Sequence, residues 1–461
     1  MPPSRLVQRP GLVTDMYHPD SAYVSWRAGL NGMTTFELFA RRAPFGGSYL
    51  LVAGLEAALD FVRDFRYSDD DIQFLDQIRD YEPAFLDELR GLRFTGDIVA
   101  MPEGSIAFPH EPLLRVTAPF REALLLESGL LQAINLATLI ATKASRIVWA
   151  AQGRPVSEFA LRRAQEPYVV TRSARIGGCW STSFLAGAAQ YRLLASGTIP
   201  HALVQLFDDE RHAFEAIAET FNRYTLLLDT YDVPRAIQTA IEVAHQYRES
   251  HGHVLAAVRL DSGDLLEQSR YIRTALNDAG LQECRILGSG DLDEYSISEL
   301  IAQGAPFDAF GVGTSIGVGA GSLEHDVEGG SLGGVYKNVA YVDDTGTTVP
   351  KIKVAGDKTT LPGAKEVYRR GSFAEDIIQL AEEPAPTDGS ERLLKPVMRA
   401  GRIVSGSLPP LSEIWELASR NLERLPGAYR RLTDPERYPV KYSEALLTLR
   451  DRALTDRDAL R

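Results

Sequence analysis

Acidic residues follow two apolar runs of the sequence at the point where each run ends. Asp261 comes directly after the run 254–260, and Asp229 follows the run 225–228. Carboxylates in such places can bind a ribose diol, hold Mg²⁺, or stabilise positive charge that develops on a sugar ring. They can also cap a following helix, and Asp264 suits that role because Glu267 completes capping-box spacing. Asp261 is therefore the stronger candidate for a functional carboxylate.

Two short glycine-containing loops follow two further apolar runs. They hold the candidate residues Ser289, Gly290, Gly311, Gly313 and Thr314. Glycine lets the backbone approach a ligand closely, so that several N–H groups can point at one phosphate. Glycines also turn a chain after a strand, but two such loops on successive strands favour phosphate binding. Neither loop matches GxxxxGK[ST], so a kinase-like triphosphate site is not indicated.

An aromatic residue and two arginines stand together after another short apolar segment. Arg162 and Arg163 could bind an anionic ligand, and Phe159 offers a face for stacking. A solvated basic turn is an equally open interpretation of this pattern. His201 precedes an apolar run, where a lone histidine is more often a core residue than a catalytic one.

The segment 313–317 fits GxSxG, the sequence of the nucleophile elbow in serine hydrolases. A predicted strand precedes it, as the elbow requires. The residues that follow, 318–334, are rich in glycine and do not resemble the helix that an elbow needs. The pattern therefore disfavours a serine hydrolase.

The elements that must position these residues alternate regularly. Apolar runs predict strands at 202–207, 225–228, 254–260, 285–287 and 309–312. Helices are expected between them, one opening at Pro234 and another ending before Gly280. This alternation predicts a parallel α/β sheet, open or closed into a barrel, with the chemistry at the carboxyl ends of the strands.

Composition limits the classes of function. The chain has 461 residues and a net charge of −13, which argues against nucleic acid as a main partner. Its two cysteines, Cys179 and Cys284, are too few for a disulfide framework and indicate a reducing compartment. The apolar stretch 128–142 is too short to span a membrane and contains polar residues. We expect a cytoplasmic protein that binds neither nucleic acid nor membrane.

The combination of motifs resembles the nicotinate phosphoribosyltransferase family, the type II phosphoribosyltransferases, over nearly the whole chain. The segments that carry the resemblance are 14–17, 36–39, 44–47, 103–105, 111–114, 159–165, 197–201, 260–264, 310–314, 332–337 and 361–363. Each is short, but their shared order is specific.

The resemblance implies a fold that the strand spacing alone leaves open. It implies an irregular, incomplete α/β barrel of the TIM type, packed on an N-terminal α/β domain with C-terminal additions. The expected parts are the N-terminal domain 1–130, the catalytic barrel 131–345, and a segment 346–461 that packs back on the first domain. The resemblance also implies a homodimer in which the region of Tyr17 completes the partner's site.

The resemblance further implies a reaction. Nicotinate and 5-phosphoribosyl 1-diphosphate would give nicotinate mononucleotide and diphosphate, a salvage step toward NAD. ATP hydrolysis would be coupled through a phosphorylated histidine, His201, and Mg²⁺ would be required. By motif, Asp261 and Arg259 would join His201 in catalysis, and Asp261 could meet the metal through the magnesium diphosphate.

The same resemblance implies the substrate contacts. Phe159 and Tyr17 would enclose the pyridine ring, and Arg162 would lie near the nicotinate. The remaining substrate-binding residues are expected to be Thr182, Ser183, Asp229, Ser289, Gly290, Gly311, Gly313 and Thr314. Two alternatives stay open: an enzyme specific for nicotinamide, and a catalytically weakened homologue that binds phosphosugars, which Ser315 suggests because many members carry arginine there.

Overall fold

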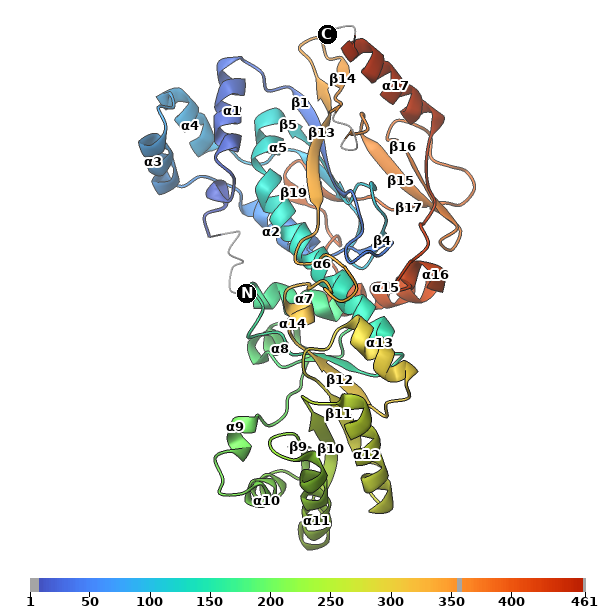
Figure 1. The fold of residues 1–461 in the computed structure, drawn as a ribbon. Helices are drawn as coiled ribbons and strands as arrows, with labels where there is room; N and C mark the ends of the chain where they lie inside the picture. Colours follow the sequence, from blue (N-terminus) through green and yellow to red (C-terminus); the bar gives the residue numbers. More distant parts are fainter. Residues whose placement is uncertain (1–7, 355–358, 459–461) are drawn as a thin grey trace. The chain divides into compact units, whose positions relative to one another are not determined.

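The computed structural model describes residues 8–354 and 359–458. The chain divides into two compact units. Unit 1 comprises residues 1–142 and 327–461, and unit 2 comprises residues 143–326. Figure 1 labels helices and strands of both units where there is room.

Unit 1 is built on an antiparallel sheet with the order β14-β13-β1-β5-β3-β18-β19. Its strands, in that order, are Thr348–Pro350, Gly334–Val342, Met33–Ala40, Leu114–Pro119, Asp97–Ala100, Lys395–Arg399 and Arg402–Ile403. Strand β1 pairs with β13, and β3 pairs with β18. Segments from the two ends of the chain therefore form one sheet, which the order of the sequence does not suggest.

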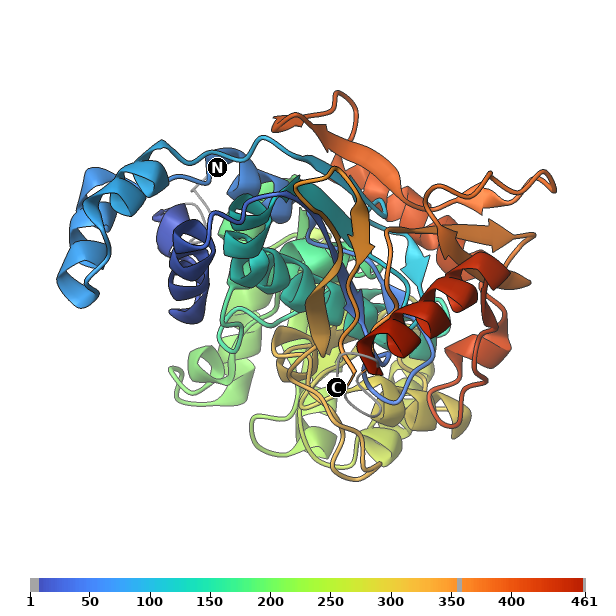
Figure 2. The ribbon, with the colours of Figure 1, turned by 90° about the horizontal axis from the view of Figure 1, so that it is seen from above.

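A smaller sheet in unit 1 has the order β17-β15-β16-β20. Its strands are Glu391–Arg392, Lys365–Arg370, Glu375–Leu380 and Val440–Tyr442. Strands β2 (Leu50–Leu51) and β4 (Ile106–Ala107) form a separate short pair. Helix α17 (Glu444–Asp458), red in Figures 1 and 2, lies against β16, and its Leu446 is fully buried.

The other helices of unit 1 carry their own signals in the sequence. They are α1 (Tyr17–Arg27), α2 (Leu55–Asp64), α3 (Asp69–Ile78), α4 (Pro83–Gly91), α5 (Phe120–Leu125), α15 (Leu411–Arg424) and α16 (Gly427–Arg430), after the 3₁₀ turn Pro10–Leu12. Ser68, for example, caps α3 by accepting a hydrogen bond from the backbone N–H of Asp71 at 3.2 Å.

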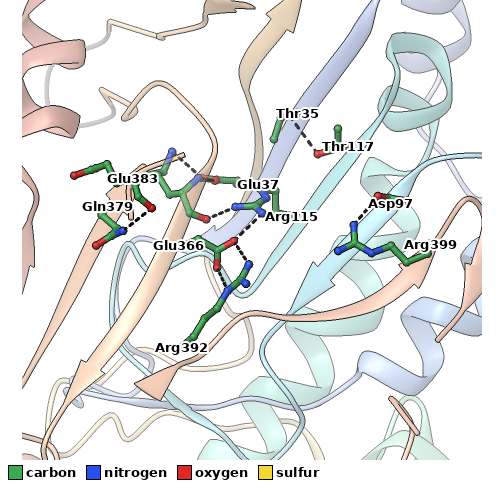
Figure 3. Close-up of polar contacts among 11 residues, drawn as sticks. Thr35, Glu37, Asp97, Arg115, Thr117, Glu366, Gln379, Glu383, Arg392 and Arg399 are labelled. Atoms are coloured by element: carbon green, nitrogen blue, oxygen red, sulfur yellow. Dashed lines mark hydrogen bonds and ion pairs between the residues drawn. The ribbon is translucent and has the colours of Figure 1, made fainter. Parts of the chain in front are cut away.

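Buried ion pairs connect the two sheets of unit 1. Lys365 Nζ lies 2.7 Å from Glu37 Oε2, and both side chains are almost completely buried. Figure 3 shows Glu366 between Arg115 and Arg392, with contacts of 2.8 and 2.7 Å. Removing one partner of the buried Lys365–Glu37 pair should cost about 3–5 kcal/mol, because the other charge is left uncompensated. These pairs therefore fix β15 against β1 and β5.

Helix α6 (Glu127–Ala150) contains the apolar stretch 128–142, and the boundary between the units falls within it. Leu130, Ile134 and Leu139 are buried, so this stretch is a core helix, as the sequence predicted. None of the helices in the described ranges has the length and apolar character needed to cross a membrane.

Unit 2 contains a parallel sheet with the order β8-β7-β6-β12-β11-β10-β9. The strands, in that order, are Leu194–Ala195, Ser181–Thr182, Val156–Glu158, Ala309–Val312, Arg285–Gly288, Val254–Leu260 and Arg223–Leu227. The sheet curls into an incomplete barrel. The predicted fold class, an irregular α/β barrel together with an α/β unit, is confirmed.

The helices of unit 2 connect these strands. They are α7 (Pro167–Ile176), α8 (Leu185–Tyr191), α9 (His201–Val204), α10 (Glu210–Thr220), α11 (Val233–His251), α12 (Leu265–Asp278), α13 (Glu294–Ala302) and α14 (Thr314–Gly317). In Figure 1, α11 and α12 lie alongside β9, β10 and β11. Asp232 caps α11 by accepting from the N–H of Arg235 at 2.9 Å, and α11 ends at Gly252, whose φ is 72°.

One predicted strand is wrong. The run 202–207 forms no strand, because it contains the short helix α9, which starts at His201 after Pro200. Val204 is completely buried, whereas Leu206 is 76% exposed. This spacing buries one side of a helical turn, and apolar runs this short do not distinguish a strand from a helix. The other four predicted strands are confirmed as β9, β10, β11 and β12.

Candidate active site

The candidate residues of unit 2 lie where neighbouring parallel strands end. Asp229 follows β9, Asp261 follows β10, Ser289 follows β11, and Gly313 follows β12. The strands are adjacent and in register, so their carboxyl ends share one edge of the sheet. The sheet therefore places these residues together, as the alternation of strands and helices predicted.

The carboxylate of Asp261 is the centre of a hydrogen-bonded network. Its Oδ1 accepts a hydrogen bond from Ser289 Oγ at 2.6 Å and another from Arg259 Nη2 at 2.5 Å. Burial alone would raise the pKa of Asp261, but the bond from Ser289 and the charge of Arg259 lower it below its usual value. The network therefore keeps Asp261 anionic at neutral pH.

Arg259 uses each of its nitrogens in this network. Nε donates to Ser289 Oγ at 2.7 Å, and Nη1 donates to Thr198 Oγ1 at 2.7 Å. The guanidinium carbon lies 5.8 Å from the centre of the Phe159 ring, within the range of a cation–π interaction. Because Arg259 is held on several sides, it fixes the relative positions of an acid, an aromatic ring and a loop.

Two of the candidate glycines are required by close packing. A Cβ on Gly311 would lie 2.3 Å from a carbon of the Phe159 ring. A Cβ on Gly290 would lie 1.8 Å from the carbonyl oxygen of Asp261, and Gly290 has a φ of 91°. Larger residues would displace the ring or the acid, so both glycines shape the edge of the sheet.

Asp229 supports the backbone of the neighbouring loop with one of its carboxylate oxygens. Oδ2 accepts from the N–H of Asp261 at 3.0 Å and from Ser262 Oγ at 2.6 Å. Oδ1 is buried and has no hydrogen-bond partner within the described part of the chain. An unpartnered buried carboxylate oxygen is unfavourable unless a ligand or water satisfies it.

His201 lies at the first position of α9 and faces two of the strand ends. Its Nδ1 lies 3.1 Å from Thr230 Oγ1, and its Nε2 lies 3.9 Å from Asp261 Oδ2. The side chain is 37% exposed. His201 is therefore a partly exposed member of the network rather than a buried core residue.

Thr182 and Ser183 lie beside a buried acid that the sequence did not reveal. Thr182 Oγ1 donates to Glu158 Oε2 at 2.6 Å, and the N–H of Phe184 donates to Thr182 Oγ1 at 3.0 Å. The N–H of Ser183 donates to the carbonyl of Glu158 at 2.9 Å. Glu158 also accepts from Thr171, so it organises the turn after β6.

Two candidates stand apart from the network. Arg162 is exposed in the turn after β6, and no hydrogen bond or ion pair is found for it within residues 8–354 and 359–458. Tyr17 belongs to α1 of unit 1, is 54% exposed, and has its ring centre 4.0 Å from that of His18. The network of unit 2 therefore includes neither residue.

Sequence reasoning missed Thr198, Thr230 and Glu158. Thr198 and Thr230 contact Arg259 and His201 through their hydroxyls. Thr198 lies in the segment 197–201 that carries the family resemblance, but a threonine in a loop has no distinctive signal of its own. Thr230 does stand directly after Asp229, at the end of a predicted strand. That position was the one signal that could have identified it.

Curled parallel α/β sheets with polar groups at their carboxyl edge are typical of proteins that bind phosphorylated ligands, and unit 2 is of this class. A model of the nicotinate phosphoribosyltransferase N-terminal domain matches residues 12–135, and one of the C-terminal domain of the same family matches residues 389–450. The chain belongs to the nicotinate phosphoribosyltransferase family, because relatives across most of its length carry that name.

These relatives include bacterial and human proteins. A nicotinate phosphoribosyltransferase of Mycobacterium tuberculosis is 38% identical over 443 residues, 95% of this chain and 92% of the relative. The enzyme of that name from Bacillus subtilis is 37% identical, covering 94% and 93%. The crystal structure of human nicotinic acid phosphoribosyltransferase aligns with a TM-score of 0.83 and 32% identity, covering 96% of this chain and all of that chain.

Proposed function

We propose that this protein transfers the phosphoribosyl group of 5-phosphoribosyl 1-diphosphate to the ring nitrogen of nicotinate, giving nicotinate mononucleotide and diphosphate. The observation that carries the proposal is the anionic Asp261, held by Arg259 and Ser289 at the edge of a curled parallel sheet, in a member of this family.

Asp261 has the charge that the reaction needs. Cleavage of the bond between ribose C1 and the diphosphate oxygen leaves its electron pair on the diphosphate and builds positive charge on the ribose. A carboxylate close to that charge stabilises the transition state more than the ground state. The ring nitrogen of nicotinate then forms the new bond with its own lone pair, so it needs positioning rather than deprotonation.

Phe159 and Arg162 are suited to position the acceptor. The Phe159 ring packs close to Gly311 and lies within cation–π range of Arg259, and it can stack on the flat pyridine ring. The donors of Arg259 are already engaged within the protein, whereas Arg162 is exposed and can pair with the nicotinate carboxylate. Arg259 therefore orients the site, and Arg162 supplies the charge that recognises the acid.

The loops after β11 and β12 would hold the 5-phosphate. Gly290 and Gly311 let their loops pack closely against Asp261 and Phe159, and Gly313 precedes Thr314, the first residue of α14. The first N–H groups of any helix lack partners within that helix, so those after Gly313 can donate to phosphate oxygens.

The carboxylates also fit Mg²⁺ brought by the diphosphate. Asp229 Oδ1 lacks a partner among the described residues, and Asp261 Oδ2 faces His201. Among the described residues, no group of three or more His, Cys, Asp or Glu side chains could hold a metal ion. Mg²⁺ does not need such a group, because it commonly binds one or two carboxylates together with substrate phosphates and water. When bound, Mg²⁺ would neutralise charge on the leaving diphosphate.

ATP coupling through His201, a homodimer that shares Tyr17, and a cytoplasmic location are further parts of this proposal. The side chain of His201 is accessible and lies next to Asp261, so phosphorylation of His201 would change the charge beside the reacting centre. The exposed ring of Tyr17 would cover the pyridine ring bound by a second copy of the chain.

The test is an assay of purified protein with Mg²⁺, nicotinate and 5-phosphoribosyl 1-diphosphate, run with and without ATP. We expect nicotinate mononucleotide in both cases, and more of it with ATP. Competition with nicotinamide should leave nicotinate as the preferred acceptor, because Arg162 offers a positive charge. Absence of the mononucleotide under both conditions would refute the function.

A further inference from the structure

A buried glutamate lies between the two chain segments of unit 2 that hold candidate residues for binding the acceptor. Glu158 ends β6, which lies between β7 and β12 in the sheet, and its side chain is almost completely buried. Phe159 follows it directly, and Arg162 lies in the turn after β6. Thr182 is paired with Glu158 on the neighbouring strand β7. The proposed reaction has so far given Glu158 no role.

Three neutral donors converge on the carboxylate of Glu158. The backbone N–H of Ala160 donates to Oε1 at 2.5 Å. The hydroxyls of Thr171 and Thr182 donate to Oε2 at 2.8 and 2.6 Å. A buried carboxylate is unfavourable unless hydrogen bonds satisfy it, and here both oxygens are satisfied. Glutamine could not replace it fully, because an amide offers an acceptor on one side and a donor on the other.

Ala160 connects Glu158 to the turn that carries Arg162. The carbonyl of Ala160 accepts from the N–H groups of Arg163 and Ala164 at 2.8 and 2.9 Å, which closes the turn. The N–H of the same residue is held by Glu158. Arg162 is exposed inside this turn, so its position depends on a backbone that Glu158 fixes.

Glu158 also fixes the segment that follows β7. Its carbonyl oxygen accepts from the N–H of Ser183 at 2.9 Å. Thr182 Oγ1 donates to the carboxylate of Glu158 and accepts from the N–H of Phe184 at 3.0 Å. The third donor, Thr171, belongs to α7, which connects β6 to β7. One side chain therefore ties together the turn 159–164, the helix after it and the segment 182–184.

We propose that Glu158 is a positioning residue of the acceptor site, which holds the turn 159–164 and the segment 182–184 in the arrangement that binds nicotinate before the substrate arrives. The inference rests on the proposed function, in which Phe159 and Arg162 bind the acceptor. It names the group that preorganises them. Preorganisation strengthens binding, because the substrate does not have to order the turn itself.

The variant that tests this role is Glu158→Gln, which keeps the shape of the side chain but can accept on one side only. The free protein then populates turns that do not bind nicotinate, and the apparent affinity falls with the fraction of competent molecules. Loss of one hydrogen bond to a charged group changes such an equilibrium about tenfold. KM for nicotinate should therefore rise on the order of tenfold. Saturating nicotinate restores the competent turn, so kcat and KM for 5-phosphoribosyl 1-diphosphate should stay close to those of the parent.

Asp308→Asn is the matched control. Asp308 Oδ2 also accepts from a backbone N–H, that of Ile286 at 2.8 Å, but Asp308 precedes β12 and so lies at the opposite end of the strands. This control should leave both KM values unchanged. Thr171→Val removes one of the three donors from a helix outside the acceptor segments, and it should raise KM for nicotinate less than Glu158→Gln does. Thermal unfolding checks that each variant folds, and Thr171→Val decides the test if Glu158→Gln does not.

The division between kinetic parameters separates positioning from stability. A purely structural role would lower kcat with the folded fraction and leave both KM values unchanged. An unchanged KM for nicotinate in folded Glu158→Gln, or equal rises of both KM values, would overturn the inference. If Glu158→Gln does not fold, an unchanged KM for nicotinate in Thr171→Val would overturn it. Failure of the proposed function is distinguishable, because the unaltered protein would then form no mononucleotide at all.

Discussion

Replacing Asp261 with asparagine tests the central electrostatic argument. The amide oxygen can still accept hydrogen bonds from Ser289 and Arg259, so the network that holds the side chain should persist. What disappears is the negative charge, which the parent protein maintains because those two partners outweigh the effect of burial on the pKa of Asp261. The variant therefore separates charge from position.

The expected magnitude follows from the role of that charge. Preorganised groups that stabilise developing charge in a transition state are each worth roughly 10²–10³ in kcat. Asp261→Asn should therefore lower kcat by about two to three orders of magnitude, with KM for both substrates changing little. Steady-state kinetics with nicotinate and 5-phosphoribosyl 1-diphosphate, each varied in turn, measure the two parameters separately.

Asp264→Asn is the matched control, because Asp264 lies in the same loop and caps α12 by accepting from the N–H of Glu267 at 3.0 Å. Asparagine caps a helix about as well as aspartate, so this variant should keep the kcat of the parent. If Asp261→Asn changed only KM, Asp261 would be a substrate-binding residue. If both variants lost kcat equally, the effect would belong to the loop and the charge argument would be refuted.

Three further predictions concern separate parts of the molecule. His201→Ala should abolish the stimulation by ATP, so that transfer rates with and without ATP become equal; an ATP response like that of the parent would show that His201 has been given the wrong role. Gly311→Ala should lower kcat/KM for nicotinate on the order of 10- to 100-fold, because the new Cβ would displace the Phe159 ring; unchanged kinetics would show that the ring does not bind the acceptor. Burial and the negative charge of Asp376 raise the pKa of Glu111 well above its usual value of 4.5, so the folded state holds the proton more tightly than the unfolded state. The free energy of unfolding should therefore fall as pH rises above about 4.5, and Glu111→Gln should remove this contribution to its pH dependence. Denaturant titrations at several pH values measure this dependence, and the same pH dependence in both proteins would contradict the prediction.

The local parts of unit 2 followed from the sequence because their causes are local. Periodic apolar runs predicted β9 to β12, and Asp264 and Gly280 predicted the ends of α12. The same reasoning placed Asp229, Asp261 and Ser289 at one edge, since parallel strands joined by helices end on the same side. The resemblance to the family added the reaction.

The sequence did not determine which loops meet across the sheet. The run 202–207 was predicted as a strand, but four to six apolar residues fit a buried helical turn as well as a strand. Only the fold showed that β8 and β9 lie at opposite edges while the segments after them meet at His201 and Thr230.

By itself, the sequence determined the strand–helix alternation, the acids at the strand ends and the family of the protein. Tertiary structure decided which side chains bind one another. Arg259 donates hydrogen bonds to Thr198, Ser289 and Asp261, and the Thr230 hydroxyl lies within hydrogen-bonding distance of one ring nitrogen of His201. The physical reason is that strand propensity and capping act over a few residues. Hydrogen bonds between loops instead depend on the curl of the sheet, which is set by packing across the whole unit.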